Sequence, residues 1–196
     1  MHRFRARDVA NAGVIAAVYA ALTLVVLQSP LGYGPVQFRL SEALTVVACL
    51  TPAAIPGLFI GTALANAYLA TQFGVLALLD VVFGSLASLL GAWWAWRHRE
   101  RRTLALAGPV VANALVVPAY LPVMLAGLAG LDFYRVPALG IDVTGAWWGM
   151  YLFGIVTVGI GQAVVVYGLG LPLLHLLDRA GIRELLDGRG AGDRNG

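Results

Sequence analysis

The stretch VLALLDVVFGSLASLLGAWWAW at residues 75–96 runs directly into RHRERR at residues 97–102. The first part is apolar apart from Asp80 and two serines, and it exceeds the roughly 20 residues that a helix needs to cross a bilayer. The second part carries four arginines, and such clusters mark the side of a membrane on which a loop stays. Together the two parts predict a transmembrane helix with a fixed orientation.

The composition of the whole chain supports the same class of protein. Of 196 residues, 60% are hydrophobic and 12% are charged, with a mean hydropathy of +0.81, whereas soluble domains carry roughly 25% charged residues. The basic residues are all arginines, and they lie between apolar runs. The net charge of +3 therefore indicates how the chain is oriented in the membrane, and it does not indicate a nucleic-acid partner. We expect one membrane domain over residues 1–187 and a polar, flexible tail over residues 188–196.

Six apolar segments predict an all-α integral membrane protein, a compact bundle of six transmembrane helices. They cover residues 9–28, 38–50, 53–70, 75–96, 104–127 and 143–177. The first has a basic start like a signal peptide but is too long for one, so we expect it to remain as a helix. The second reaches only about 20 Å as an α-helix, which fits either a tilted crossing or a re-entrant segment.

The distribution of arginines favours a crossing for the second segment. Arginines precede the first segment and follow the fourth and the sixth; they are Arg3, Arg5, Arg7, Arg97, Arg99, Arg101, Arg102, Arg179, Arg183, Arg189 and Arg194. These eleven residues share one side of the membrane only if every segment crosses. We therefore expect a multi-pass protein of the cell membrane with both termini in the cytoplasm.

Few polar side chains lie within the apolar segments, and each is a functional candidate because an ionisable group at mid-depth costs about 2.5–3.5 kcal/mol. They are Arg39, Glu42, Asn66, Asp80, Asn113 and Gln162. On the predicted topology they outline a polar pocket open to the outside. The alternative is structural: Arg39 and Glu42 pair with each other on one helix face, and the amides bond neighbouring helices.

The first segment carries small residues at four-residue spacing. Ala12, Ala16 and Ala20 form one row, and Gly13, Ala17 and Ala21 form a second row offset by one residue. Small residues allow another helix to approach closely. That helix belongs either to this chain or to another subunit.

The sequence lacks the motifs of several functional classes. Cys49 is the only cysteine, and no Cys/His cluster has metal-ligand spacing. There is no phosphate-binding loop, so this chain cannot energise transport with ATP by itself, and there is no catalytic motif. We expect no enzyme activity, no cofactor and no metal.

Four stretches resemble a known family. They are GPVQFRLSEAL at 34–44, TPAAIPGLFIGTALAN at 51–66, DVVFGSLASLLGA at 80–92 and YGLGLPLL at 167–174. They closely resemble the QueT family of substrate-binding S components of energy-coupling factor transporters, assigned to queuosine precursors. The resemblance implies a six-helix subunit that captures ligand from outside and associates with a membrane scaffold subunit and two cytoplasmic ATPase subunits. It also implies that Ala12, Ala16 and Ala20 contact the scaffold.

Queuosine precursors are 7-deazaguanines, whose guanine edge offers paired N–H donors beside a carbonyl acceptor. A carboxylate suits the donors, and an amide or arginine suits the carbonyl. We therefore expect Glu42 or Asp80 to accept from the base, with Asn66, Asn113 or Gln162 completing the set. Phe38 and Tyr33 either stack on the base or cap the pocket, or they are simple anchors at the membrane interface. Gln162 departs from the family, which often carries Glu there. The candidate substrate-binding set is Gln37, Phe38, Arg39, Glu42, Asn66, Asp80, Asn113 and Gln162.

Three other functions stay open at this point. The chain could be an S component for another flat heterocyclic vitamin, such as riboflavin, thiamine or folate. It could be a stand-alone proton-coupled carrier that uses Glu42 or Asp80 as a relay. It could also be a structural subunit without a ligand.

Overall fold

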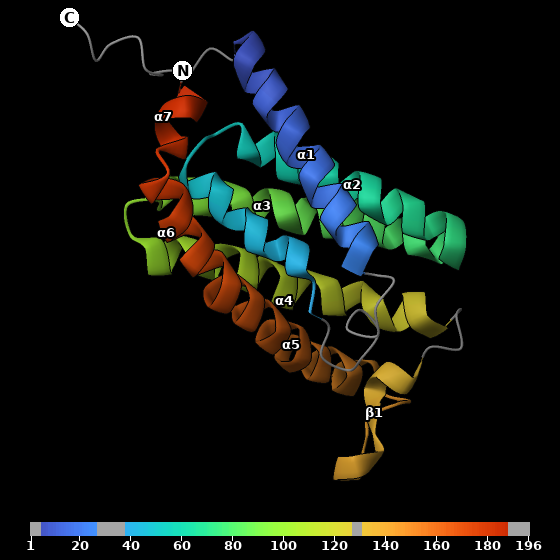
Figure 1. Cartoon of the computed structure of the whole chain (residues 1–196). Coiled ribbons are helices and arrows are strands. Elements are labelled where there is room, and N and C mark those ends of the chain that lie inside the picture. Colours follow the sequence, from blue (N-terminus) through green and yellow to red (C-terminus); the bar gives the residue numbers. More distant parts are fainter. Residues whose placement is uncertain (1–4, 27–37, 127–130, 188–196) are drawn as a thin grey trace, which may run out of the picture.

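The computed structural model describes residues 5–26, 38–126 and 131–187, and helices dominate it (Figure 1). In chain order the helices are α1 (Ala6–Val26), η2 (Leu40–Cys49), α2 (Ala54–Phe73), η3 (Val75–Ala77), η4 (Asp80–Gly84), α3 (Ser85–Arg97), α4 (Arg102–Ala126), η5 (Leu131–Tyr134), η6 (Pro137–Leu139), α5 (Trp147–Ala163), η7 (Val164–Gly170), α6 (Leu171–Arg179) and α7 (Ile182–Asp187). The predicted all-α class is confirmed.

Five helical runs among the described residues are long and apolar enough to cross a membrane. They are Ala6–Val26, Ala54–Gln72, Val75–Arg97, Arg102–Ala126 and Trp147–Arg179. Each coincides with a predicted segment to within a few residues. The last is a single run of 33 residues that combines α5, η7 and α6. The chain is therefore a multi-pass helical membrane protein.

The second predicted segment forms η2, a 3-10 helix of 10 residues. A 3-10 helix rises about 2.0 Å per residue, so the 10 residues of η2 reach about 20 Å. This equals the length expected from the sequence for residues 38–50 as an α-helix. Most of its side chains are buried, because it lies in the interior among α1, α3, α4 and η7 (Figure 1). Whether η2 crosses the membrane, and therefore the count of six crossings, stays a prediction.

Polar contacts gather several helix ends at one end of the bundle. Arg102 at the start of α4 pairs with Asp178 in α6 at 2.5 Å. Arg183 in α7 donates to the carbonyl of Cys49 at the end of η2, at 3.4 Å, and Asn11 in α1 donates to a carbonyl of α7 at 3.3 Å. The start of α1, the 97–102 loop and α7 consequently lie at the same end (Figure 1).

A short hairpin precedes α5. Strands β1 (Arg135–Val136) and β2 (Ile141–Asp142) pair antiparallel, and Arg135 lies 3.2 Å from Asp142 across the pair. The Asp142 carboxylate accepts bonds from the hydroxyl and the backbone N–H of Thr144 at 2.5 and 2.9 Å. These bonds to the charged form lower the pKa of the Asp142 carboxyl.

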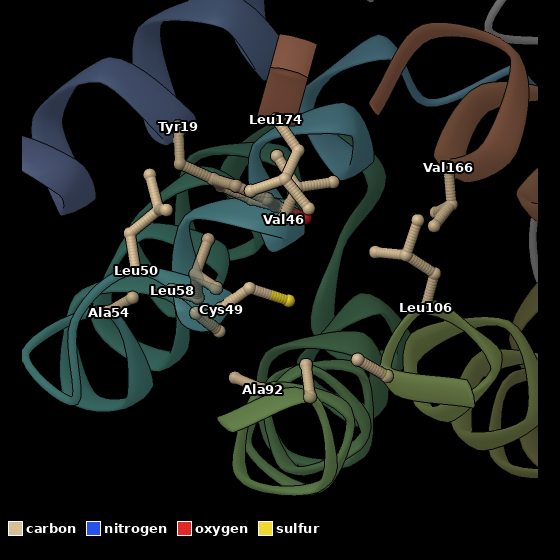
Figure 2. Close-up of a cluster of buried hydrophobic side chains, with 13 residues drawn as sticks. Tyr19, Val46, Cys49, Leu50, Ala54, Leu58, Ala92, Leu106, Val166 and Leu174 are labelled. Carbon is tan, nitrogen blue, oxygen red and sulfur yellow. The ribbon is translucent and has the colours of Figure 1, made fainter. Parts of the chain in front are cut away.

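Side chains from most of the spanning helices meet in one apolar core. Figure 2 shows this cluster, to which Tyr19 contributes from α1, Val46 from η2, Leu58 from α2, Leu106 from α4 and Leu174 from α6. All five are almost completely buried. The core surrounds η2 and so fixes the position of the polar residues at its beginning.

Candidate functional site

Two carboxylates are buried inside the bundle. The exposed fraction is 1% for Glu42 and 5% for Asp80. Glu42 lies in the first turn of η2, and Asp80 begins η4, a π-helical segment within the run that continues into α3. Single π-helical turns are common at functional sites. Each carboxylate has its own set of hydrogen-bond donors.

The first set, the Glu42 group, consists of Glu42, Tyr19 and Asn113. The Tyr19 hydroxyl donates to Oε1 of Glu42. The Asn113 amide Nδ2 lies 3.5 Å from Oε2 of Glu42 and donates to the Pro109 carbonyl at 3.0 Å. Both donors are neutral, and within the described ranges no arginine forms an ion pair with Glu42.

The second set, the Asp80 group, consists of Asp80, Arg39, Tyr120, Asn66 and Gly84. Nη2 of Arg39 lies 3.2 Å from Oδ2 of Asp80, and the Tyr120 hydroxyl donates to Oδ1 at 2.5 Å. The Asn66 amide donates to the backbone carbonyl of Asp80 at 2.8 Å. The guanidinium neutralises Asp80, so this group contains its own ion pair.

Gly84 makes room for the Asp80 group. A Cβ atom at this position would lie 2.6 Å from Oδ1 of Asp80, 3.0 Å from Nδ2 of Asn66 and 3.3 Å from the Tyr120 hydroxyl. Contacts below 3.0 Å require an atom to shift, and the hydrogen bonds of the Asp80 group hold these polar atoms in place. The polar side chains therefore close directly over a glycine backbone.

Helix α4 connects the two groups. Asn113 and Tyr120 are seven residues apart, which places them on the same face of the helix, two turns and about 10 Å from each other. One residue thus bonds Glu42 and the other bonds Asp80. Arg39 and Glu42 make the same connection from the start of η2.

The predicted structural alternative paired Arg39 with Glu42, but Arg39 pairs with Asp80 instead. Arg39 precedes η2 with φ of −78° and ψ of 89°, so it does not continue the helical face of Glu42. Its guanidinium reaches η4, whereas Glu42 points toward α1 and α4. The two residues serve different groups.

Two buried polar atoms near these groups have no hydrogen-bond partner among the described residues. They are Oγ of Ser41, which precedes Glu42, and Oε1 of Gln162 in α5. Gln162 lies one turn beyond Gly159, whose added Cβ would lie 3.5 Å from Ala114. Ala114 follows Asn113, so Gln162 belongs to the part of α5 that packs near the Glu42 group.

The structure therefore distributes the predicted site residues in a definite way. It brings Arg39, Asn66 and Asp80 into one group, and Glu42 and Asn113 into the other. Phe38 is half-buried immediately before Arg39. Gln37, like Tyr33, lies outside the described residues.

Sequence reasoning missed three members of the two groups, Tyr19, Tyr120 and Gly84. A signal was available for the tyrosines, because a phenol within an apolar span needs a hydrogen-bond partner. Tyr19 is 2% exposed and Tyr120 is 7% exposed. No sequence signal distinguishes Gly84 from the other 23 glycines.

One of the two rows of small residues on α1 packs against another helix of this chain. Ala12 and Ala16 are buried, and added Cβ atoms on Gly57 and Gly61 of α2 would lie 2.9 and 2.8 Å from their carbonyl oxygens. Ala20 is half-buried. The offset row, Gly13, Ala17 and Ala21, is exposed. The first row therefore packs on α2, and the second row faces away from the bundle.

Comparisons with known proteins agree with the family resemblance seen in the sequence. The family model described as QueT transporter matches residues 9–179. The queuosine precursor transporter QueT of Lactococcus lactis subsp. cremoris (strain MG1363) is 31% identical over 90 residues, which cover 46% of this chain and 50% of that protein. The chain thus matches half of the length of this relative. No solved structure matches the chain.

Proposed function

Because the chain belongs to the QueT transporter family, we propose that it is the substrate-binding membrane subunit of an importer for a queuosine precursor. The Glu42 group carries this proposal. Glu42 is 1% exposed, and within the described residues its carboxylate has only a hydroxyl and an amide as partners and no cation paired with it. Burying a charge in this way is costly unless a further partner compensates it.

A 7-deazaguanine supplies that partner. Its ring N–H and exocyclic amine form adjacent donors, which match the two oxygens of a carboxylate. Each oxygen of Glu42 accepts one bond within the protein, and a carboxylate oxygen has a second lone pair to offer. Glu42 is therefore the anchor for the base, and Tyr19 and Asn113 hold its orientation.

Gln162 and Arg39 are suited to the other groups of the ligand. Oε1 of Gln162 is a buried acceptor without a partner among the described residues, so it can receive a further N–H. Arg39 has donors beyond the one that contacts Asp80, and these suit the carbonyl of the base. Asn66 stabilises this arrangement through the backbone of Asp80.

The charge of the two groups favours one member of the substrate class. Glu42 and Asp80 carry two negative charges when ionised, and Arg39 carries one positive charge. In that state the site has a formal charge of −1, which an ammonium group would neutralise. We therefore propose that 7-aminomethyl-7-deazaguanine binds more tightly than the neutral 7-cyano compound.

The energy for transport would come from partner subunits. The sequence has no phosphate-binding loop, so we propose assembly with a membrane scaffold subunit and two ATPase subunits. Of the predicted scaffold residues, Ala12 and Ala16 pack on α2 and Ala20 is half-buried, so we propose that the scaffold contact uses Ala20 and the exposed row beside it. Both termini would lie in the cytoplasm, with the substrate entering from outside.

A thermal-shift experiment on the detergent-solubilised chain tests the substrate. The panel is 7-aminomethyl- and 7-cyano-7-deazaguanine, queuine, guanine, riboflavin and thiamine. A ligand at 100 times its Kd stabilises the folded state by about 2.7 kcal/mol, so a 7-deazaguanine should raise the unfolding temperature while the two vitamins do not. Glu42→Gln should abolish the shift, whereas Asp142→Asn in the exposed hairpin should keep it.

Other outcomes would redirect the assignment. Stabilisation by a vitamin would keep the family architecture and overturn the substrate. A full response in Glu42→Gln would show that Glu42 does not anchor the base. Uptake by the chain alone that an uncoupler abolishes would indicate a proton-coupled carrier and exclude dependence on ATPases.

A further inference from the structure

An apolar groove of about 330 Å³ lies on the surface between α3 and α4, and its lining includes no member of either carboxylate group. Its lining includes Leu90, Trp93, Trp94, Ala107, Gly108 and Val111. Leu90, Trp93 and Val111 are each more than half exposed. In a membrane protein such a surface faces the acyl chains, so water-soluble ligands have no access to it along this side.

The floor of the groove is held in a fixed shape. The Trp94 indole N–H donates to the Leu104 carbonyl at 2.9 Å. Its ring lies directly on α4, because an added Cβ on Gly108 would fall 2.3 Å from ring atom Cδ1. The neighbouring pair, Gly91 on Pro109, is also in close contact, with a Cβ distance of 2.7 Å to the proline backbone. Close packing of α3 on α4 therefore fixes the shape of the groove.

Positive charge lies at one end of this groove. Leu90, Trp93 and Arg97 are spaced by three and four residues, which places them along one face of α3 with the arginine at the membrane surface. Arg101 lies in the same loop, immediately before α4. Both arginines are exposed, and neither forms an ion pair within the described part of the chain.

The other arginines of the loop are already engaged. Arg99 lies over the Trp96 ring at 4.1 Å and donates to the Trp96 carbonyl, and Arg102 pairs with Asp178. Glu100 offsets one of the four positive charges of the loop. Arg97 and Arg101 thus remain to bind an anion at the mouth of an apolar groove.

We propose that this groove binds an anionic phospholipid. One acyl chain would lie against Trp93, Trp94 and Val111, and the phosphate would lie between Arg97 and Arg101. Tryptophan at the level of the headgroups and arginine beyond it match the polarity gradient of a phospholipid. A lipid with a neutral headgroup would lose the attraction of the arginines, so the site should prefer an anionic headgroup as well as an acyl chain that fits the groove.

Native mass spectrometry of the detergent-purified chain tests the proposal with dioleoyl phosphatidylglycerol and dioleoyl phosphatidylcholine. Phosphatidylglycerol should bind more tightly, by about fivefold for each arginine and about 25-fold for the two together. Arg97→Gln with Arg101→Gln should remove this preference. Arg179→Gln, an exposed arginine at the end of α6, is the matched control and should keep it.

A second pair of variants tests the groove itself. Val111→Trp fills the groove from an exposed position and should weaken phosphatidylglycerol binding, whereas Val123→Trp, equally exposed on α4 but outside the lining, should not. Equal binding of the two lipids would overturn the proposal. So would an unchanged preference in the double arginine variant, full binding by Val111→Trp, or displacement of the lipid by glycerol phosphate alone.

Discussion

At the scale of single residues, Glu42 and Asp80 differ in how their charge is compensated. Asp80 has the Arg39 guanidinium at 3.2 Å, and Glu42 has a hydroxyl and an amide. Both side chains are buried, so water solvates neither carboxyl group well. Because Glu42 lacks a cationic partner, hydrogen bonds from a ligand should stabilise it more than they stabilise Asp80.

Gly84 gives a residue-scale prediction. Gly84→Ala should force the Asp80 carboxylate away from Tyr120, because the new Cβ would lie 2.6 Å from Oδ1. We expect the free energy of unfolding to fall by about 1–3 kcal/mol, as for other overpacked sites. Denaturant titration in mixed micelles measures it. The shift of Asp80 should also reduce the thermal response to a 7-deazaguanine.

Gly13→Ala is the matched control for this prediction. Nothing lies within 4 Å of an added Cβ there, and alanine is favoured over glycine in a helix by about 1 kcal/mol. Gly13→Ala should therefore leave stability unchanged or raise it slightly. If the two variants are equally stable, the Asp80 group does not depend on close contact with the glycine backbone.

At the scale of helices, irregular turns coincide with the polar groups. Glu42 lies in a 3-10 helix, Asp80 begins a π-helical segment, and Gln162 lies two residues before another, η7. Helix α4 contains Pro109, Pro118 and Pro122, and each proline leaves a backbone carbonyl without its usual donor. The Asn113 amide bonds one carbonyl in this helix, that of Pro109. The carbonyls freed in this way are those of Ala105, Ala114 and Pro118, so the Asn113 bond to the Pro109 carbonyl is an additional contact.

The two rows of small residues on α1 give a helix-scale prediction. Ala16→Leu should destabilise the isolated chain by about 1–3 kcal/mol, because Ala16 is 4% exposed and packs on Gly61. Ala17→Leu should change stability by less than about 0.5 kcal/mol, because Ala17 is exposed. Unfolding in detergent compares the two variants directly.

Copurification with partner subunits then distinguishes the roles of the two rows. If the exposed row contacts a scaffold subunit, Ala17→Leu should fold normally but fail to copurify with the partner subunits. Normal copurification of Ala17→Leu would exclude a contact that depends on this row. A normally stable Ala16→Leu would contradict the packing of α1 on α2.

At the scale of the whole molecule, the end of the bundle that carries the 97–102 loop is held by ionic contacts. Asp178 lies 2.5 Å from Arg102 and 3.8 Å from Arg183, and Arg183 also bonds the end of η2. The opposite ends of η2 and of the η4–α3 run meet through Arg39 and Asp80. Polar contacts therefore tie η2 to its neighbours at both ends.

Asp178→Asn tests the contribution of the first of these clusters. The side chains of Arg102 and Asp178 are 39% and 22% exposed, so water and salt screen the pair and its contribution should be at most about 1 kcal/mol. We expect the unfolding temperature to fall by about 2–4 °C at low ionic strength. The difference should shrink at high salt.

Glu100→Gln removes a carboxylate from the exposed loop at the same end and serves as the control. It should leave the unfolding temperature within about 1 °C of the parent, given the small effect of surface substitutions. A loss in Asp178→Asn that does not respond to salt would show that packing, and not charge, dominates at this position.

The sequence by itself determined the class of the protein and the positions of its long helices. Lipid cannot bond an exposed backbone, so long apolar runs must be helices, and five of the six predicted segments coincide with helices long enough to span. The cost of charge in lipid also identified Glu42 and Asp80 as candidates before any contact was known. The GPVQFRLSEAL stretch at 34–44 pointed to the family that the family model confirms.

Only the tertiary structure decided which of these residues meet. Arg39 pairs with Asp80, 41 residues away, and Tyr19 bonds Glu42, 23 residues away. It also decided that residues 40–49 wind as a 3-10 helix and that Ala12 and Ala16 pack on α2. The physical reason is that hydropathy depends on each residue's own transfer free energy, whereas polar partners depend on the rotation and depth of helices that are distant in sequence. Those rotations are set by close packing at glycines such as Gly61 and Gly84.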